Sequence, residues 1–316
     1  MSTITRRGRA LRRAVATAAV AVAMAATAGT AFAAGDPGAA ADRARAEAER
    51  RTESAPSARA LADADAPVLT PTFAMTAVDK RTSNLYLYFS DEAGGFDPRY
   101  DVGVGYEGFA DSIDVDNDKD GWRDGGWALY TDGRLTYGWS DDSLQYHTNK
   151  IGTGWNIYTK VLSPGSLGGA AEADLIAVDK AGVLWQYLAY PEGRLTPRQR
   201  LGGGWGQYTQ IESQGDLTGD GKPDIVARDT SGVLWLYQGT GDYKAPFTAR
   251  TKVGGGWNTF DRILSVGDLD EDGVSDLVAR KPNGELFRYS GTGSATGALY
   301  KPPVKIGHGF QVYNLL

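Results

Sequence analysis

The chain contains no cysteine and only two histidines, His147 and His308. Without cysteine, disulfides, zinc–thiolate sites and a cysteine nucleophile are excluded. The Gly-x-Ser-x-Gly segment that marks many serine hydrolases is absent as well. Helical periodicity is also missing, because no window of ten or more residues between positions 67 and 316 places apolar residues at helical spacing. These absences predict a β-rich domain without thiol or zinc chemistry, and we expect no catalytic residues.

Residues 1–33 have the composition of a secretory signal peptide. Five arginines, Arg6 and Arg7 among them, precede an Ala-rich apolar run over residues 14–30, and small residues precede Ala34. We predict cleavage before Ala34 and a secreted, extracellular protein. A membrane span is the alternative, but the run is short and consists mostly of alanine. The adjacent arginines are compatible with twin-arginine export, and the sequence leaves this route and the general route open.

The charge of the mature chain limits its partners. Removing residues 1–33 removes five arginines and no acid, so the net charge falls from −6 to −11. An acidic chain is unsuited to phosphate backbones and anionic membranes, so neither nucleic acid nor a membrane is expected as a partner. Residues 34–66 are rich in Ala, Arg and Asp with few large apolar side chains, which is typical of a disordered or loosely helical linker. Residues 67–316 are numerous enough to bury a core, and we expect one monomeric domain.

Five copies of one phrase run through residues 67–316: Gly, any residue, Gly, an aromatic residue, two further residues and a second aromatic residue. The first aromatic residues of successive phrases are 49, 50, 52 and 53 positions apart. Self-similarity at a nearly constant period indicates one object built from five like units. The phrases begin at Gly103, Gly152, Gly202, Gly254 and Gly307. The repeats predicted from them span about 67–113, 114–162, 163–212, 213–264 and 265–316.

Each repeat has the composition of four short strands. An apolar run such as residues 224–227 is followed by a polar turn, an alternating strand such as residues 233–237, a third strand and the phrase, which leads into a fourth strand such as residues 260–266. Four antiparallel strands in about 50 residues are typical of a propeller blade, whereas solenoid repeats are usually shorter or helical. We predict an all-β, five-bladed β-propeller of four-stranded antiparallel blades. Residues 314–316 end partway through a fourth strand, and residues 68–75 begin in a first strand, so the two ends should share one blade.

Three repeats open with an aspartate-rich turn, here called loops 116–124, 216–224 and 268–276. Oxygen ligands at positions 1, 3, 5 and 9, a carbonyl at position 7 and glycine at position 6 suit Ca²⁺. A solvated Asp-Gly turn is the alternative. An EF-hand is not expected, because position 12 is apolar and a strand follows position 9. The predicted ligands are Asp116, Asp118, Asp120, Trp122, Asp124, Asp216, Thr218, Asp220, Lys222, Asp224, Asp268, Asp270, Asp272, Val274 and Asp276, where Trp122, Lys222 and Val274 supply backbone carbonyls.

Two repeats depart from this loop. The turn over residues 165–174 has Ser, Gly and Ala in place of three ligands, so no ion is expected there, and the first repeat has no recognisable loop. The loops and the apolar strand that follows them resemble the FG-GAP/VCBS repeats of secreted β-propellers and integrin heads. The glycine-aromatic phrase and its period are similar to tachylectin-type five-bladed propeller lectins. Together these resemblances imply a calcium-bearing propeller and sugar binding, and they imply no catalysis.

Aromatic side chains are the candidate ligand-binding residues, because sugars stack on aromatic faces. The repeated Trp155, Trp205 and Trp257 either line pockets between blades or pack as core between them. The second repeat has surplus tryptophans, Trp122 and Trp139 among them, and we expect the Trp122 side chain to point to solvent. Together with Trp127, Tyr137, Tyr146 and His147 they form either an exposed ligand patch or a local repacking around Gly125 and Gly126.

The sequence therefore predicts a secreted, non-catalytic binding module whose favoured partner is an extracellular glycan. A module that binds a cell-surface or secreted protein is the first alternative, because the propeller fold does not fix function. An extracellular carbohydrate-active enzyme is the second, because the spacing of a glycosidase carboxylate pair is spatial and cannot be read from sequence. Several equivalent sites with an aromatic ring and polar groups would favour a lectin, and one broad apolar face would favour a protein partner.

Overall fold

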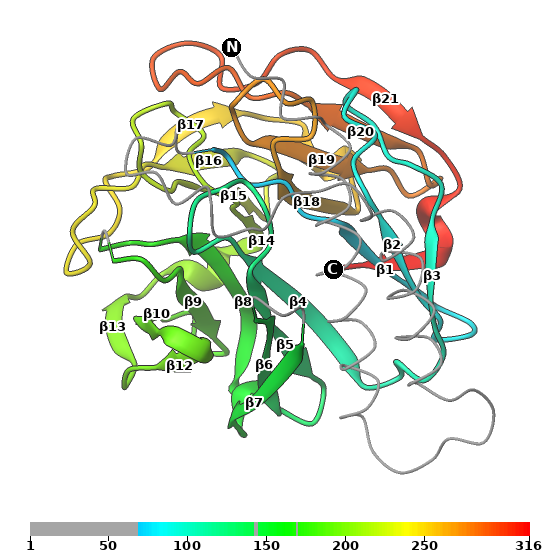
Figure 1. The fold of residues 1–316 in the computed structure, drawn as a ribbon. Coiled ribbons are helices and arrows are strands. Elements are labelled where there is room, and N and C mark those ends of the chain that lie inside the picture. Colours follow the sequence, from blue (N-terminus) through cyan, green and yellow to red (C-terminus); the bar gives the residue numbers. More distant parts are fainter. Residues whose placement is uncertain (1–68, 142–144, 169) are drawn as a thin grey trace, which may run out of the picture.

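The computed structural model describes residues 69–141, 145–168 and 170–316. The predicted signal peptide and linker lie outside these residues. The described chain forms five four-stranded antiparallel sheets and one two-stranded hairpin, and the sheets are arranged as blades around a common axis (Figure 1). The predicted five-bladed all-β propeller is thereby confirmed. None of the helices in the described part of the chain is long and apolar enough to cross a membrane.

The blades are numbered here in chain order. Blade 1 contains β22 (Tyr313–Leu315), β1 (Met75–Asp79), β2 (Leu85–Tyr88) and β3 (Tyr100–Gly103). Blade 2 contains β4 (Phe109–Val115), β5 (Gly125–Tyr130), β6 (Leu135–Ser140) and β7 (Tyr146–Gly152). Blade 3 contains β8 (Tyr158–Gly165), β9 (Asp174–Asp179), β10 (Leu184–Tyr187) and β13 (Gln199–Gly202). Blade 4 contains β14 (Tyr208–Glu212), β15 (Ile225–Asp229), β16 (Leu234–Tyr237) and β17 (Thr251–Gly254). Blade 5 contains β18 (Arg262–Gly267), β19 (Asp276–Arg280), β20 (Leu286–Tyr289) and β21 (Val304–Gly307).

The first strand of each blade lies nearest the axis and follows the glycine-aromatic phrase. In blade 1 this strand comes from the other end of the chain: β22 pairs with β1, with Tyr313 opposite Asp79 and Leu315 opposite Ala77. In Figure 1 the red β22 lies beside the blue β1. The ring is therefore closed by a blade shared between the two ends, as predicted, and β22 covers the inner edge of β1.

The core lies in the seams between adjacent blades. Each of the five hydrophobic clusters takes its buried residues from two neighbouring blades. At the seam between blades 3 and 4, for example, Ile176 and Val178 of β9 join Ile211 of β14 and Ile225 of β15, and all four are at most 4% exposed. Alternation along each strand places such residues on one face of a sheet, so stacking the blades removes them from water.

The phrase forms the contact between successive blades. Its second glycine has a left-handed backbone, with φ of 83° at Gly154 and 90° at Gly204, and a short 3-10 turn follows. A Cβ at Gly154 would meet no neighbouring atom, so the backbone angle and not space requires glycine there. The amide of Trp155 then donates to the carbonyl of Gly133 in the preceding blade (2.9 Å). The four turns are η2 (Trp155–Ile157), η4 (Trp205–Gln207), η5 (Trp257–Thr259) and η6 (Phe310–Val312).

Candidate functional sites

The three aspartate loops share one backbone structure. In each loop three side-chain carboxylates accept hydrogen bonds from backbone amides of the same loop. The carboxylate at position 1 accepts from the N–H of position 6, the carboxylate at position 5 from the N–H of position 7, and the carboxylate at position 9 from the N–H of position 2. The glycine at position 6 is left-handed in every copy, with φ of 88° at Gly121, 80° at Gly221 and 92° at Gly273. Position 4 is left-handed too, although Lys119 and Glu271 occupy it in two of the loops, with φ of 60° and 57°.

Loop 116–124 brings three of its acids together. One oxygen each of Asp116, Asp118 and Asp120 lies within 4.8 Å of the others. Asp116 Oδ1 is buried without a hydrogen-bond partner, and burial, together with the other loop carboxylates, raises the pKa of Asp116 to about 8. The adjacent Arg123 turns inward and pairs with Asp114 at 2.6 Å. The loop thus surrounds a buried oxygen with negative charge, and a hard cation fits this donor set.

Loop 268–276 also brings three acids together, but positive side chains lie among them. One oxygen each of Asp268, Asp270 and Asp276 lies within 4.8 Å of the others, and Asp270 Oδ1 is buried without a partner. Arg288 Nη2 lies 3.2 Å from Asp270, and the Lys301 ammonium lies 2.6 Å from the acid at position 5. These cations partly neutralise the loop, so a metal ion would have to compete with them.

Loop 216–224 has no such group of three acids, and all its residues are described. Both oxygens of Asp216 accept backbone amides, and both oxygens of Asp224 do the same. Thr218 stands at position 3, and Lys222 Nζ lies 3.5 Å from Asp220. The three loops therefore share a backbone structure but differ in how many carboxylate oxygens remain available to bind a cation.

The loop-like turn over residues 166–174 keeps only the last aspartate. Asp174 is 1% exposed, and its two oxygens accept the amides of Leu167 and Ala189, both at 2.9 Å. Asp224 and Asp276 make the equivalent pair of bonds in their own blades. In blades 3, 4 and 5 the position 9 carboxylate therefore ties the loop to the chain that follows the third strand, whether or not the other acids are present.

Residues 69–73, here called the strap, join two of the loops. The first amide of the strap donates to Lys119 O, and the amide of Thr72 donates to Gly121 O, both at 3.1 Å. Thr72 Oγ1 donates to Asp268 O at 2.6 Å. The strap therefore fastens loop 116–124 to loop 268–276 across the end of the ring where the loops lie.

The repeated tryptophans of the phrase are packing residues in this structure. They are 7–9% exposed and belong to the seam clusters, so little of each ring is open to a ligand. This is the packing alternative of the sequence analysis. The ring pairs are Trp155 with Tyr187 at 4.8 Å, Trp205 with Tyr237 at 4.7 Å and Trp257 with Tyr289 at 4.7 Å between centroids.

A different aromatic position carries an exposed arginine. In blade 3 the guanidinium of Arg198 lies 4.1 Å above the half-buried ring of Trp185, and its Nη1 donates to the hydroxyl of Tyr158 at 3.2 Å. The indole Nε1 of Trp185 donates to Asp179 Oδ2 at 2.8 Å. Two contacts therefore hold an exposed cation in a fixed place at the rim of a seam, and we call this arrangement a seam site.

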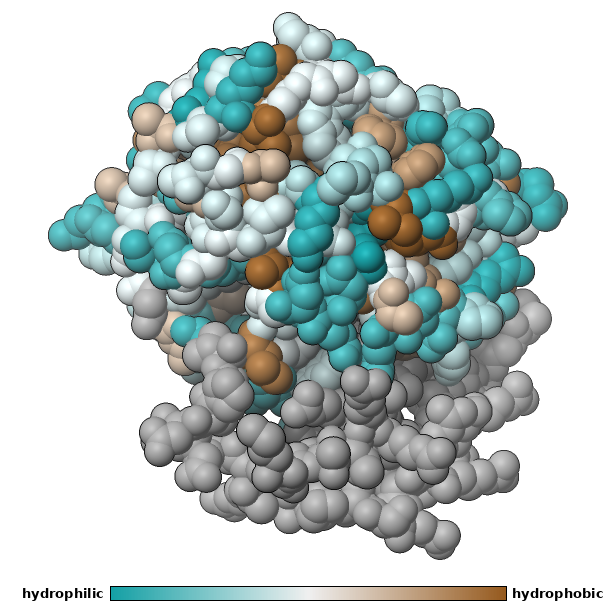
Figure 2. Space-filling view, turned by 90° about the horizontal axis from the view of Figure 1, so that it is seen from above, coloured by the Kyte–Doolittle hydropathy of each residue, from teal (hydrophilic) through white to brown (hydrophobic). Residues whose placement is uncertain are grey.

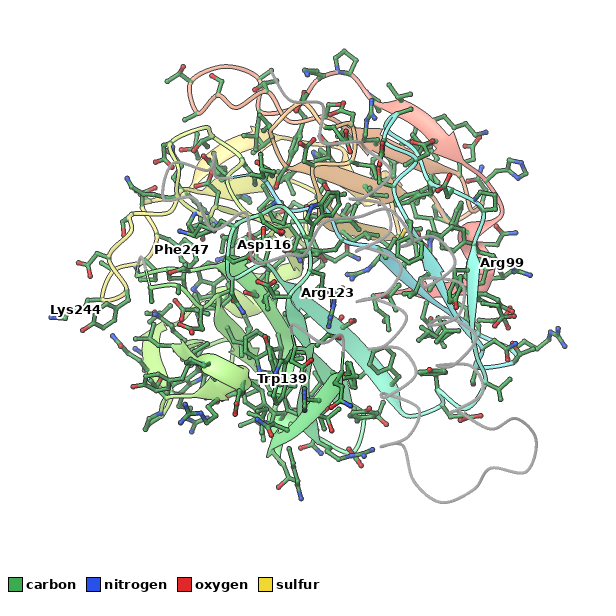
Figure 3. The ribbon with its side chains drawn as sticks, in the orientation of Figure 1. Arg99, Asp116, Arg123, Trp139, Lys244 and Phe247 are labelled. Carbon is green, nitrogen blue, oxygen red and sulfur yellow. The ribbon has the colours of Figure 1, made fainter. Side chains whose placement is uncertain are left out.

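The seam site is repeated in phase. Each arginine immediately precedes the outermost strand of its blade, at Arg99, Arg198 and Arg250. The sequence analysis did not single out these arginines, and their recurrence in front of the outermost strand is the signal that could have revealed them. Figure 3 places Arg99 at the edge of the ring beside β3. In blade 4 the members are Arg250, Trp235, Tyr208 and Asp229, and in blade 1 they are Arg99, Tyr86 and Tyr313.

Part of the surplus aromatic group in blade 2 is buried beneath a hairpin of blade 3. Trp127 is 2% exposed, and its Nε1 donates to Gly193 O at 3.1 Å. Tyr137 is 3% exposed and packs under the same glycine, and a Cβ at Gly125 would meet its hydroxyl at 2.3 Å. For these two rings the structure agrees with the second alternative of the sequence analysis, local repacking around Gly125 and Gly126, because both rings are buried and support the hairpin. That hairpin consists of β11 (Ala189–Tyr190), η3 (Pro191–Gly193) and β12 (Arg194–Leu195).

The remaining blade 2 candidates are half-buried. Trp139 stacks on His147 with ring centroids 5.3 Å apart and planes inclined by 26°. His147 Nε2 lies 2.8 Å from Asp141 Oδ2. Trp122 is half-buried, whereas the sequence analysis expected its side chain to point to solvent. Trp139 and Asp116 are both labelled in Figure 3, where Trp139 lies on blade 2 and Asp116 lies nearer the centre of the view.

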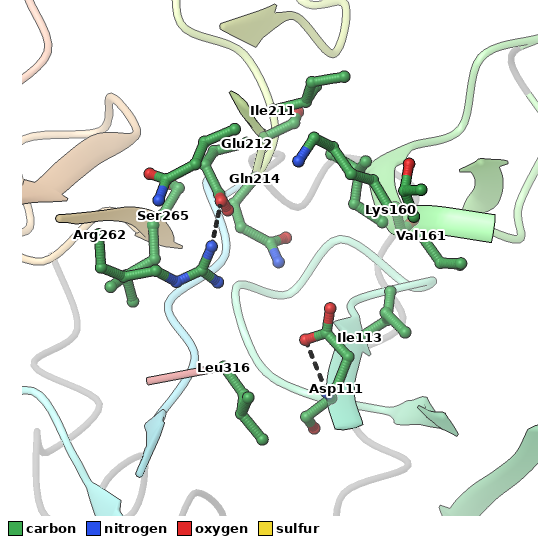
Figure 4. A pocket seen from close by; sticks show the side chains of 17 residues that line it. Asp111, Ile113, Lys160, Val161, Ile211, Glu212, Gln214, Arg262, Ser265 and Leu316 are labelled. Atoms are coloured by element: carbon green, nitrogen blue, oxygen red, sulfur yellow. Dashed lines mark hydrogen bonds and ion pairs between the residues drawn. The ribbon is translucent and has the colours of Figure 1, made fainter. Parts of the chain in front are cut away.

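The inner strands enclose a polar cavity of about 150 Å³ on the axis (Figure 4). Four charged side chains from four blades line it: Asp111, Lys160, Glu212 and Arg262. Glu212 Oε1 pairs with Arg262 Nη1 at 2.8 Å. Burial raises the pKa of Asp111 to about 6 and that of Glu212 to about 7. Sequence reasoning did not find this cavity, because its four charged residues are separated by as many as 151 positions.

Comparison with known proteins supports the repeat assignment. Residues 216–279 match the sequence model of the FG-GAP-like repeat. This range covers two of the aspartate loops, so the resemblance to FG-GAP repeats is confirmed there. No curated protein sequence matches the chain.

Several solved propellers have a similar arrangement of strands. The BP39L lectin from Burkholderia pseudomallei is 11% identical, with 76% of this chain and 72% of that chain covered and a TM-score of 0.47. The six-bladed fungal lectin of Aleuria aurantia is 14% identical, with 76% and 79% covered and a TM-score of 0.38. The Nup133 propeller domain of Vanderwaltozyma polyspora is 9% identical, with 75% and 74% covered and a TM-score of 0.37. Likenesses this distant carry no argument about what the present chain binds.

Proposed function

We propose that this protein is an exported, calcium-binding β-propeller that binds glycans without catalysing a reaction, and that it contacts them at the seam sites. The observation that supports this proposal is the threefold, in-phase repetition of an exposed arginine held on an aromatic ring. Several equivalent sites of this kind are what distinguishes a lectin from a module with one docking face. Cleavage before Ala34 belongs to the proposal, and the mass of the secreted chain checks it.

The chemistry of a seam site suits hydroxyl-rich ligands. A guanidinium has five N–H donors in a planar fork, and the protein occupies only one nitrogen, Nη1, in the contacts to the tyrosine hydroxyls. The exposed remainder can donate to two neighbouring hydroxyls, or to the carboxylate of an acidic sugar. Because stacking and the tyrosine contact already fix the side chain, little rotamer entropy is lost on binding.

The surface gives less support to a protein partner. Large exposed apolar side chains in the described part of the chain are scattered over different blades. The face seen in Figure 2 is mainly hydrophilic, with small separate hydrophobic patches. A broad apolar face would be expected of a protein-binding propeller. The exposed apolar residues are Tyr100, Val104, Ile157, Tyr190, Tyr243, Val304 and Val312.

Calcium would act in this proposal as a structural ion. The donor set of loop 116–124 fits it best, because Asp116 Oδ1 is a buried carboxylate oxygen without a partner, whereas in loop 268–276 Arg288 and Lys301 already pair with the acids. Asp116, Asp118, Asp120 and Asp124 would hold the ion with the carbonyl of Trp122. When bound, the ion supplies the positive charge that these carboxylates lack in the protein itself, and it fixes the loop to which the strap is attached.

A glycan array with the secreted chain tests the binding function. We expect binding to a defined set of glycans, and we expect the double variant Arg198→Ala, Arg250→Ala to weaken it about tenfold or more, because each lost charge-assisted hydrogen bond costs about 1.5–3 kcal/mol. Arg134→Ala is the matched control, since Arg134 also lies over an aromatic ring, Tyr130, at 4.1 Å but outside the seam sites. Arg250→Lys keeps the charge without the planar fork and should behave like the alanine variant.

Two results would contradict this function. Equal loss of binding in the Arg134 control would assign the effect to the fold and not to the seam sites. Release of reducing ends from a glycan that the array does not retain would identify an enzyme, and Asp111 and Glu212 of the axial cavity would then be the first carboxyl groups to test.

A further inference from the structure

The axial cavity lies at a second position in the molecule, away from the seam sites. An adjoining open pocket of about 340 Å³ shares Asp111, Arg262 and Leu316 with it and has Ala110, Asp261 and Asn314 on its wall. These wall residues follow the glycine-aromatic phrases, so the outer pocket lies at the end of the ring that carries the 3-10 turns. The strap crosses the opposite end, where a Cβ at Gly267 would meet Pro71 O at 1.7 Å. A ligand would therefore enter past Ala110.

The side chains that line the cavity differ from blade to blade, although they occupy equivalent positions of the repeat. Asp111, Lys160, Gln210 and Arg262 occupy one register position, opposite residues 129, 178, 228 and 280 of the neighbouring strands. Packing alone would favour apolar side chains on the inside of so small a ring. The position instead holds one acid, two bases and an amide, and burying such groups is unfavourable unless they are paired or solvated by polar atoms.

Most of these groups are already bound by the protein. Lys160 Nζ donates to the carbonyl of Thr209 at 2.5 Å. Arg262 donates to Glu212 and, through Nε, to Leu315 O at 3.0 Å. The amide of Gln210 bonds the backbone of β18 and of the residue before it. Each of the two cations is therefore held by a protein acceptor, and the acids Asp111 and Glu212 balance their charges, which argues against an anionic ligand.

Asp111 is the exception. Its carboxylate accepts one bond, from the amide of its own neighbour Ser112 at 3.0 Å. No bond or ion pair joins it to another blade within the described residues. Figure 4 shows Asp111 and Gln214 directed into the space between the inner strands. Unused acceptor capacity at Asp111, next to bases that repel cations, favours a ligand that donates hydrogen bonds but carries no charge.

The dimensions set the size of that ligand. A cavity of about 150 Å³ holds one molecule of the size of a six-membered ring. Apolar side chains, Leu264 and Leu316 among them, complete the wall and can face the C–H groups of such a ring. From these observations we propose that the axial cavity binds one neutral, polyhydroxylated molecule per chain, a monosaccharide or the terminal sugar of a glycan, with Asp111 as its main hydrogen-bond acceptor. The proposal rests on the glycan-binding function and adds to it a single deep site, distinct from the three seam sites.

Titration calorimetry of the full secreted chain with free D-glucose, D-galactose, L-fucose and N-acetyl-D-glucosamine tests this site. We expect at least one of these sugars to bind with a stoichiometry of one, and Asp111→Asn to weaken it about tenfold or more. Ala110→Trp, which narrows the entrance without touching a charged group, should abolish binding. Val104→Trp is the matched control, because Val104 is exposed outside the pocket, and melting curves show whether each variant is folded.

The outcomes separate this site from the proposed function. Sugar binding that survives Ala110→Trp and Asp111→Asn but is lost in Arg198→Ala, Arg250→Ala would overturn the axial site and leave the seam sites standing. Preference for glucosamine or glucuronate over the neutral sugars would overturn the argument from charge. Absence of binding to any free sugar, with normal binding on the array, would overturn the axial site alone. Absence of both would overturn the two proposals together.

Discussion

Loop 116–124 and the turn over residues 166–174 occupy equivalent places in successive blades, but they retain different parts of the same loop. Both keep the last aspartate, which accepts the amide of position 2 through Asp124 in one and Asp174 in the other. Only loop 116–124 keeps the acids at positions 1, 3 and 5. The position 9 carboxylate is therefore part of the fold, whereas the other carboxylates are present in one blade and absent from its neighbour, as expected of the calcium ligands that we propose.

The largest effect is expected from Asp174→Ala. Its two bonds to buried backbone amides would be lost, at about 1–3 kcal/mol for each group left unsatisfied, so we expect the free energy of unfolding to fall by about 3 kcal/mol with or without calcium. Denaturant unfolding in calcium and in EDTA measures it. Asp116→Ala is the control, and in EDTA it should cost little, because it also removes like-charge repulsion.

The comparison would fail if Asp116→Ala in EDTA were as destabilising as Asp174→Ala. Both carboxylates would then be structural in the same sense. If Asp174→Ala does not fold, Asp174→Asn, which keeps one acceptor oxygen, should give an intermediate loss.

Removal of calcium should affect stability only through loops that hold the acids at positions 1, 3 and 5. At a concentration about a hundred times the dissociation constant, an ion bound only by the folded state adds about 2.7 kcal/mol to the free energy of unfolding. We expect EDTA to lower the melting temperature of the wild type, and we expect the variant Asp116→Asn, Asp118→Asn to lose most of this response. Asp220→Asn, in the loop without an acid cluster, should retain most of it. An unchanged melting curve in EDTA would remove calcium from the proposal.

Glu212 is a buried acid that pairs with a cation of the protein, Arg262, and not with a metal ion. Burial raises its pKa to about 7 in the folded state, although Arg262 opposes this. Between its ordinary pKa of 4.5 and about 7, the folded state holds a proton that the unfolded state has lost. Stability should therefore be greatest below this range and fall by on the order of 1 kcal/mol as the pH rises through it. Glu212→Gln should flatten the profile, and an unchanged slope would show that another group is responsible.

The smallest effect concerns the backbone of the loop. Lys119 has φ of 60°, in a region that costs a non-glycine residue about 1–2 kcal/mol. Lys119→Gly should raise the free energy of unfolding by about 0.5–1 kcal/mol, after allowance for the greater freedom of glycine in the unfolded chain. Lys119→Ala is the control and should show no such gain, because its Cβ keeps the strain. A gain in both variants would point to the lysine charge instead.

Much of this protein could be predicted from local sequence. The blade number follows from the spacing of the phrases, and the closure of the ring follows from the incomplete units at the two ends. The left-handed glycines at Gly121, Gly221 and Gly273 follow from the loop motif. The glycine conformations depend on residues within a few positions of one another, and the blade number and the closure depend on a unit that recurs along the chain, so the sequence pattern determines them.

The chemistry of the sites could not be predicted in the same way. The loops have three similar sequences, but in the structure Lys301, 29 positions beyond Asp272, and Arg288 of β20 pair with acids of loop 268–276. In the sequence Trp127 is one of the surplus aromatic residues of the second repeat, and only the structure shows that the hairpin of blade 3 covers it. The seam arginines are ordinary charged residues in the sequence and become distinctive only because Trp185 and Trp235 lie beneath two of them.

The sequence by itself determined that the chain forms five like blades, that three of them carry acidic turns of one shape, and that no thiol chemistry is possible. Only the tertiary structure decided which aspartates crowd together, which aromatic rings are buried in seams, and that Asp111 and Glu212, 101 positions apart, share one cavity. The physical reason is the range of the forces involved. Backbone angles and strand alternation are fixed within a repeat, whereas burial and charge depend on side chains that closing the ring brings together.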